Sequence, residues 1–410
     1  MKKDSTAPNW RMTTLEEIAA PIPNAIVDGP FGSNLKISDY VEDGVPVLQG
    51  KNITNDTFRW FDVRFISTHK ASELKRSSVR IGDILLVKIG SIGYSAVVRD
   101  LRGFDFAIIP ANLAKITPNT EIIDTEYLHK WLTSVETKRY LEGVASKTAQ
   151  PALSLGKIKA LPIPLPPLPE QRRIAEVLDR AEALRAKRRA ALAQLDTLSQ
   201  SIFFDLFGDP ATNPKGWPVH LLQEVVKQGT IVTYGIVQAG EEYPAGVPYI
   251  RTGDIVDGEI VQHGLRHTDP AIAARFLRSR VEAGEIVISI RATVGTTAVV
   301  PPELDGANLT QGTARIAPGS LVDRTYLLYY LRTSGTQHWI SLQIKGATFR
   351  EITLSRLREL PVQVPPMSLQ CDFARRITAV ETLRTAHRIS IAELDALFAV
   401  LQHRAFRGEM

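Results

Sequence analysis

Cysteine is almost absent from this sequence, since Cys371 is the only one in 410 residues. A single thiol excludes a disulfide scaffold and any zinc site that needs several thiolates. Long apolar runs are also missing: no stretch reaches about 18 consecutive apolar residues, so we expect no transmembrane helix. The chain starts Met-Lys-Lys-Asp and leads into polar residues, without the apolar segment of a signal peptide. The expected location is therefore cytoplasmic.

A strong charge of one sign is lacking as well. The 49 Lys and Arg residues stand against 44 Asp and Glu residues, which leaves a net charge of +5. This mild excess permits a nucleic-acid partner but does not require one. Apolar residues make up 44% of the chain and charged residues 23%, which is typical of a globular protein with a buried core and excludes disorder as its main state.

The two halves of the sequence are similar to each other. Residues 79–98 align without gaps on residues 281–300, and seven of those 20 positions are identical. Gly44–Leu48 recurs as Gly246–Ile250, and Leu161-Pro162 recurs as Leu360-Pro361. The matches keep their order along the chain, and their spacing is far longer than the periods of about 20–50 residues in solenoids. The pattern predicts a tandem duplication of one unit of about 200 residues.

Each repeat opens with a part that mixes strands and helices. Short apolar runs between Gly, Pro, Asn and Asp predict strands at Val45–Leu48, Ile84–Ile89, Ala96–Val98, Ile286–Ile290 and Thr297–Val300. Helical patches are expected at Thr125–Tyr140 and Arg324–Ile340. This mixture indicates an α+β fold.

Each repeat ends in a proline-rich hinge and a long helix. The first hinge, 161–169, has the sequence LPIPLPPLP and predicts a stiff, extended segment. Gly and Pro are then absent from Glu170 to Leu206, which favours a helix of roughly 55–60 Å. Apolar residues in both long helices follow a heptad pattern, from Val177 to Ile202 and from Val380 to Leu401. We expect the two helices to pair as an antiparallel coiled coil in a pseudo-two-fold repeat, although each helix could instead fold onto its own globular domain.

The predicted organisation has four segments. A globular domain over 1–160 is followed by a hinge and long helix over 161–208, a second globular domain over 209–360, and a second hinge and helix over 361–410. Two similar globular domains in one chain, here called heads, are suited to recognising two sites on one linear partner, and DNA is the obvious candidate. Because the heads have diverged, the two half-sites would differ.

Three segments resemble a known family. The run DGPFGSNLK at Asp28–Lys36 is similar to the opening of target-recognition domains in the DNA-specificity subunits of type I restriction–modification systems. The run LPPLPEQRRIAEVL at Leu165–Leu178 resembles that family's central helical region, and GATFREI at Gly346–Ile352 resembles the segment that closes its second recognition domain. The second hinge departs from the pattern, because it keeps Gln370 but lacks the acidic-Gln-basic-basic run of Glu170–Arg173.

The resemblance implies a role as well as a fold. Each α/β target-recognition domain would read one half of a bipartite, asymmetric double-stranded DNA target. The long helices would set the spacer and dock two methyltransferase subunits, and an endonuclease/translocase subunit could join them. The chain itself would be non-catalytic and hold no cofactor, while S-adenosylmethionine, ATP and Mg would belong to the partner subunits.

Alternative functions leave only weak signatures. Asp62, Glu73 and Lys75 loosely imitate a nuclease core, but such a pattern arises easily by chance in a charged chain and the second repeat has no equivalent. His263 and His267 are spaced like metal ligands on a helix, but Gly264 lies between them and no HExxH glutamate is present, so we expect surface-loop histidines. Glycine-rich Gly90–Gly93 lacks the ending of a phosphate loop and is expected to form a tight turn. A stand-alone DNA nuclease or methyltransferase, or a protein-binding adaptor, remains the alternative function. We expect no catalytic or metal site in this chain.

Basic and amide side chains supply the candidate binding residues. Arginine and lysine contact phosphates and guanine, whereas Asn and Gln can pair with adenine. The candidates for DNA contact are Lys36, Gln49, Lys51, Asn52, Arg64, Lys88, Arg251, Arg266, Arg278, Arg280 and Arg291. On the first long helix, partner docking and a solvated helix face are equally good interpretations, and DNA backbone contact is a third. The candidates there are Arg172, Arg173, Arg180, Arg185 and Arg188.

Overall fold

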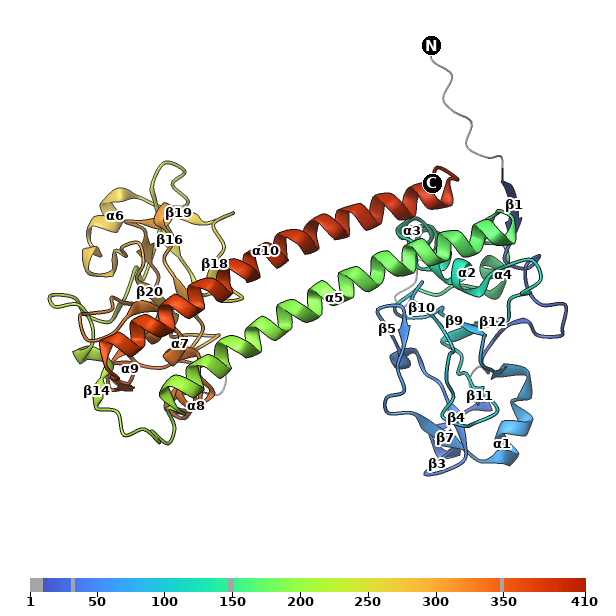
Figure 1. Ribbon diagram of the computed structural model, residues 1–410, viewed down its shortest axis with the longest axis horizontal. Coiled ribbons are helices and arrows are strands. Elements are labelled where there is room, and N and C mark those ends of the chain that lie inside the picture. Colours follow the sequence, from blue (N-terminus) through green and yellow to red (C-terminus); the bar gives the residue numbers. More distant parts are fainter. Residues whose placement is uncertain (1–9, 31–33, 147–150, 347–349) are drawn as a thin grey trace, which may run out of the picture. The chain divides into compact units, whose positions relative to one another are not determined.

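The chain forms two compact units (Figure 1). The computed structural model describes residues 10–30, 34–146, 151–346 and 350–410. Unit 1 comprises Met1–Arg188 with Ser390–Met410, and unit 2 comprises Arg189–Ile389. Each long helix therefore contributes residues to both units. The four-segment division of the sequence, which gives each helix to a segment of its own, stays a prediction.

Unit 1 is built on two sheets. A four-stranded antiparallel sheet has the order β10-β9-β12-β2, with bounds β10 (Ser95–Val97), β9 (Ile84–Val87), β12 (Leu113–Ile116) and β2 (Ile26–Asp28). The second sheet has the order β3-β7-β4-β11-β8, with bounds β3 (Tyr40–Val41), β7 (Arg64–Ile66), β4 (Val45–Val47), β11 (Ala107–Ile108) and β8 (Ser78–Val79). A hairpin joins β5 (Ile53–Thr54) to β6 (Thr57–Phe58).

Unit 2 repeats this arrangement. Its four-stranded sheet has the order β15-β23-β20-β21, with bounds β15 (Thr233–Tyr234), β23 (Thr313–Ile316), β20 (Ile286–Ser289) and β21 (Thr297–Val299). Its second sheet is smaller and has the order β19-β16-β22, with bounds β19 (Arg266–Thr268), β16 (Val247–Ile250) and β22 (Asn308–Leu309). The hairpin is β17 (Ile255–Val256) and β18 (Glu259–Ile260). The strands predicted from the apolar runs are all present, and the mixed α+β fold is confirmed.

Short helices connect and cover these sheets. In unit 1 they are α1 (Thr68–Glu73), α2 (Thr125–Leu132), α3 (Val135–Val144) and α4 (Leu155–Lys159). In unit 2 they are α6 (Pro270–Ala274), α7 (Arg324–Arg332), α8 (Ser334–Gln343) and α9 (Leu354–Arg358). Each predicted helical patch is thus two helices, because a hydroxyl side chain interrupts it: Ser134 caps α3 and Thr333 caps α8.

The proline-rich hinges form edge strands. β13 (Pro162–Leu165) pairs antiparallel with β1 (Arg11–Thr14), and β24 (Pro361–Gln363) pairs antiparallel with β14 (Val219–Leu221). Prolines are tolerated there because each of these sheets has only two strands, so one side of the strand needs no donor.

The long helices are α5 (Leu168–Phe207) and α10 (Met367–Phe406), of 40 residues each. Gly208, at φ +81°, follows the end of α5, as expected for a glycine beyond a helix C-terminus. In unit 1, Arg185 of α5 bonds Asp395 of α10 at 2.6 Å; in unit 2, Arg384 of α10 bonds Asp196 of α5. The early part of one helix therefore meets the late part of the other in each unit, which confirms antiparallel pairing.

The predicted apolar seam is only partly buried. Leu184 and Leu198 are each 44% exposed, and Leu397 is 60% exposed. The side chains between the helices include Arg185, one position beyond Leu184, which is only 16% exposed. The face used for pairing is therefore rotated from the one predicted, and it holds charged pairs.

The main core of each unit joins the four-stranded sheet to the paired helices. In unit 1 the buried cluster includes Leu86 of β9, Tyr127 of α2, Leu178 of α5 and Phe406 of α10. Unit 2 has an equivalent cluster. No helix within the described ranges is long and apolar enough to cross a membrane.

Candidate nucleic-acid interface

The 3₁₀ turn η3 (Gly50–Asn52) carries several residues predicted to contact DNA. Asn52 is fully buried: its Oδ1 accepts from the Gln49 backbone N–H at 2.8 Å, and its Nδ2 donates to the carbonyls of Arg59 and Phe61 at 3.2 and 2.6 Å. All its polar capacity holds this loop together. The hypothesis that Asn52 pairs with adenine is corrected on this point, because a buried amide with these partners cannot reach a base.

The other predicted residues of unit 1 that surround η3 reach the surface. Lys51 is paired with Asp62, and that hydrogen bond lowers the pKa of the Asp62 carboxyl. Arg64 is exposed, and its guanidinium lies 5.3 Å from the centre of the Tyr40 ring. Lys36 is also exposed, and Gln49 is half-buried.

Lys88 is not a surface residue. Its side chain is 4% exposed, and Nζ donates to Oδ2 of Asp28 at 2.5 Å. The pair ties the end of β9 to the end of β2, because Asp28 is the last residue of β2. The prediction that Lys88 contacts DNA is corrected: this lysine is buried within unit 1.

In unit 2 the predicted arginines are distributed around the turn η6 (Thr252–Asp254) and beyond. Arg251 donates to both carboxylate oxygens of Asp254, at 3.0 and 2.6 Å, and this raises the pKa of its guanidinium. Arg291 donates to Glu351 at 3.2 Å and is 40% exposed. The remaining predicted arginines, on β19 and around η7 (Leu277–Ser279), are exposed: Arg266, Arg278 and Arg280.

A cleft of about 410 Å³ lies beside η3 in unit 1. Its lining includes Lys51, Ser91, Tyr94 and Asn112, so ammonium, hydroxyl and amide groups converge on it. Lys51 is among the residues predicted from the sequence to contact DNA, whereas Asn112 is not. No local sequence pattern marks Asn112, because its position beside Gly50 and the cleft arises only in the folded unit.

The arginines predicted for partner docking fall into two groups. Arg172 and Arg180 are 68% and 77% exposed on α5, and Arg188 is exposed too. Arg173 bonds Glu170 at 2.7 and 2.8 Å. Arg185 differs, because it lies between Asp395 and Glu182, each at 2.6 Å, and its guanidinium stacks 4.4 Å from the centre of the Phe398 ring. Its interactions lie within unit 1.

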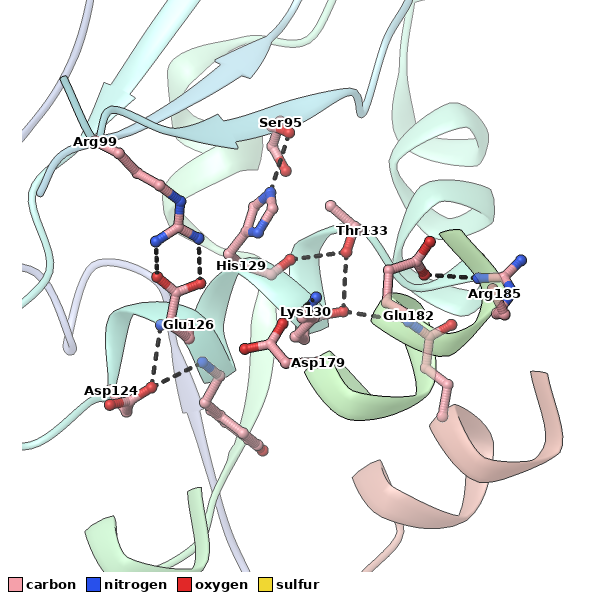
Figure 2. A network of polar contacts seen from close by, with 12 residues as sticks. Ser95, Arg99, Asp124, Glu126, His129, Lys130, Thr133, Asp179, Glu182 and Arg185 are labelled. Atoms are coloured by element: carbon pink, nitrogen blue, oxygen red, sulfur yellow. Dashed lines mark hydrogen bonds and ion pairs between the residues drawn. The ribbon is translucent and has the colours of Figure 1, made fainter. Parts of the chain in front are cut away.

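A polar network connects α2 of unit 1 to the sheet and to α5 (Figure 2). Arg99 donates to both oxygens of Glu126, at 2.5 and 2.6 Å. Nε2 of His129 lies 3.1 Å from the Ser95 carbonyl, as Figure 2 shows. Burial lowers the pKa of His129, and none of the described residues forms a hydrogen bond with its Nδ1.

Residues considered for an enzymatic site have structural partners instead. Asp62 pairs with Lys51, and Glu73 pairs with Lys70 at 2.9 Å. Across the described parts of the chain, no group of three or more His, Cys, Asp or Glu residues could hold a metal ion.

Comparisons with known proteins identify relatives of the chain. Residues 33–194 and 214–394 match the family described as Type I restriction modification DNA specificity domain. The chain is 23% identical over 337 residues to the type I restriction enzyme EcoBI specificity subunit of Escherichia coli; the match covers 75% of this chain and 66% of that protein, just under two thirds. It is 24% identical over 391 residues to the putative type I restriction enzyme MjaX specificity subunit of Methanocaldococcus jannaschii, which covers 92% of this chain and 87% of that protein.

A solved structure supports the fold. It comes from work on complex assembly and conformational transition of the type I R-M system, and its TM-score is 0.59 at 21% identity, with coverage of 98% of this chain and 99% of that chain. The two segments that match the family model, 33–194 and 214–394, together span most of the sequence. The chain therefore belongs to the family of type I restriction–modification DNA specificity subunits and carries the family's domain twice.

Proposed function

We propose that this chain is the DNA-recognition subunit of a type I restriction–modification complex, without catalytic activity of its own. Unit 1 reads one half of a bipartite, asymmetric DNA target, and unit 2 reads the other half. The observation that supports this proposal most directly is duplication with divergence. The two units share the strand order of their four-stranded sheets and the arrangement of their short helices, yet they carry different polar residues on η3 and η6.

The basic surface residues of both units would hold the DNA. Lys36, Lys51 and Arg64 in unit 1 are exposed, as are Arg266, Arg278 and Arg280 in unit 2. Contacts to phosphates fix the position of a protein on DNA, and contacts to base edges give specificity. The small net charge of +5 fits a subunit whose partners supply part of the positive surface.

The long helices α5 and α10 would set the spacer and dock two methyltransferase subunits. Arg172, Arg180 and Arg188 support this part of the proposal, because they project from α5 and are exposed. S-adenosylmethionine, ATP and Mg would be bound by the partner subunits, and an endonuclease/translocase subunit could join the same assembly.

The direct test uses the purified chain with its methyltransferase partner. The complex should retard a duplex that contains one bipartite sequence, and its affinity should fall steeply as salt increases. The chain alone should neither transfer methyl groups nor cleave DNA. DNA cleavage by the chain alone that Asp62→Ala abolishes would overturn the proposal in favour of a nuclease. Protein binding without salt-dependent DNA retention would favour an adaptor.

A further inference from the structure

The turns η3 and η6 occupy equivalent positions on the same backbone frame. In unit 1 the Gln49 N–H donates to Asn52 Oδ1 at 2.8 Å; in unit 2 the Arg251 N–H donates to Asp254 Oδ2 at 2.7 Å. Asn52 is 0% exposed and Asp254 is 7% exposed. The residue that closes each turn is thus buried and structural, and the surface of the turn is free to vary between units.

One pair of positions beside these turns exchanges its residue types between the units. Asn112 and Gly312 are equivalent, because their carbonyls accept from Lys88 and Ile290 at 2.9 and 2.8 Å, and these two donors align in the repeat. In unit 1 a Cβ on Gly50 would stand 2.7 Å from Nδ2 of Asn112. The glycine of the turn therefore leaves room for the amide.

Unit 2 has the reverse arrangement. Thr252 takes the place of Gly50, and a Cβ on Gly312 would stand 2.5 Å from Oγ1 of Thr252. The glycine now lies on the opposite side of the contact. Each unit thus presents one polar side chain across the turn, but from a different position. A backbone frame that is kept while the polar residue at this point changes is expected of two domains that recognise different targets.

Polar groups around this point differ as well. In unit 1, Asn112 lines the cleft of about 410 Å³ with Lys51, and no described residue forms a hydrogen bond with its side-chain amide. In unit 2, Arg291 lies next to the equivalent point, since a Cβ on Gly312 would stand 3.9 Å from the Cβ of Arg291. Arg291 is 40% exposed and holds one bond to Glu351.

We propose that Asn112 and Arg291 are specificity-determining residues of units 1 and 2. An Asn amide pairs with N6 and N7 of adenine, and an Arg guanidinium pairs with O6 and N7 of guanine, in the major groove. Asn112 therefore reads an adenine in one half-site, and Arg291 reads a guanine in the other. This inference rests on the proposed function and adds to it the identity of two base-reading residues.

The experiment selects duplexes from a randomised library with the complex of the full chain and its methyltransferase partner. The wild-type complex should give one bipartite sequence. Asn112→Ala should lower the preference for adenine at one position of one half-site by about ten-fold or more, and leave the other half-site unchanged. Arg291→Ala should do the same to guanine in the other half-site, so each variant is the control for the other.

A second variant covers the case in which Asn112→Ala folds poorly. Asn112→Asp keeps the size of the side chain and removes its donor, so the preferred base at that position should change from adenine to cytosine. Lys159→Met is the matched surface control. Lys159 is the last residue of α4, pairs with Glu16 and lies outside the cleft. This variant should leave both half-sites unchanged.

Two results would overturn the inference. One is an unchanged sequence preference in the Asn112 and Arg291 variants. The other is an equal loss of affinity for all sequences, which would indicate phosphate contacts. A wild-type complex that selects no bipartite sequence would instead overturn the proposed function, so the two failures are distinguishable.

Discussion

Gln171 and Gln370 attach the long helices to the globular part of their units. Gln171 is 0% exposed; its Oε1 accepts from the Asp124 N–H at 2.7 Å, and its Nε2 donates to the carbonyls of Ile122 and Pro166 at 3.0 and 2.8 Å. Gln370 makes the same three bonds in unit 2, with distances of 2.8, 3.1 and 2.8 Å. This explains why the degenerate second hinge keeps its glutamine: the residue positions the helix against the loop before α2 or α7.

Removal of this side chain should destabilise one unit only. Gln171→Ala leaves the Asp124 N–H and two carbonyls unpaired in the interior, and we expect a loss of about 2–3 kcal/mol in unit 1. Hydrogen exchange at the amides of α2 should report the loss, while the amides of α7 in unit 2 stay protected. Gln194→Ala, at an exposed position on α5, is the control and should leave the hydrogen exchange of both α2 and α7 unchanged. Equal loss of protection in both units would contradict this assignment.

The buried imidazole of His129 should make the stability of unit 1 depend on pH. Burial lowers its pKa in the folded state, so below about pH 6.5 the unfolded chain binds a proton that the folded chain does not. The free energy of unfolding should therefore fall as the pH drops below about 6.5. His129→Gln keeps a donor for the Ser95 carbonyl but does not titrate. Urea midpoints at about pH 7.5 and 5.5 should differ less for this variant than for the wild type; the same difference in both would refute the role of His129.

At the scale of elements, the paired helices are held by two equivalent ion clusters. Arg185 lies between Glu182 and Asp395 in unit 1, and Arg384 lies between Glu381 and Asp196 in unit 2. Both arginines are largely buried, at 16% and 13% exposed. Partial burial reduces screening by water, so each pair should contribute more than an exposed one.

A double-mutant cycle measures this contribution. The coupling between Arg185→Ala and Asp395→Ala should be about 1 kcal/mol in the free energy of unfolding. The control is the pair of Arg180 with Glu176, which lies within α5 and is 77% and 61% exposed. Its coupling should stay below about 0.5 kcal/mol, because an exposed pair within one helix is screened. If the two couplings were equal, the cluster would have no special role in joining α5 to α10.

The sequence predicted the elements well and the candidate site less well. The repeat, the apolar runs and the absence of Gly and Pro over 170–206 located the strands and both long helices, because these signals are local. Burial of polar residues depends on contacts distant in sequence. The partner of Lys88 is Asp28, 60 residues away, and no local pattern shows that contact. Asn112 was missed for the same reason: its importance depends on its proximity to Gly50 in the folded unit.

At the scale of the whole molecule, two helices of equal length connect the two units, and the proposed spacer function depends on both. Insertion of one heptad into α5 and one into α10 lengthens each helix by about 10 Å and keeps its faces nearly in phase. The complex should then select a different spacer and the same half-site sequences. Library selection measures both properties at once.

The control for this prediction is a heptad inserted into α5 alone. When this heptad is placed between Arg185 and Asp196, their separation along α5 no longer matches that of Arg384 and Asp395 along α10, so the two ion pairs cannot form together. Binding to bipartite DNA should be lost, whatever the spacer. If the double insertion changed the half-site sequences, the helices would not set the spacer alone, and the proposed separation of spacer and sequence recognition would be wrong.

The division of the chain also fixes an order of completion during synthesis. Unit 2 is one continuous segment, Arg189–Ile389, whereas unit 1 needs Ser390–Met410 as well. Phe406 belongs to the core of unit 1, where its ring centre lies 5.6 Å from that of Tyr127 and 4.9 Å from that of Trp131. Domains usually fold in the order in which they leave the ribosome. Here the unit that is begun first is completed last, so a ribosome that stops just after Ile389 would release a chain with a complete second unit and an incomplete first one.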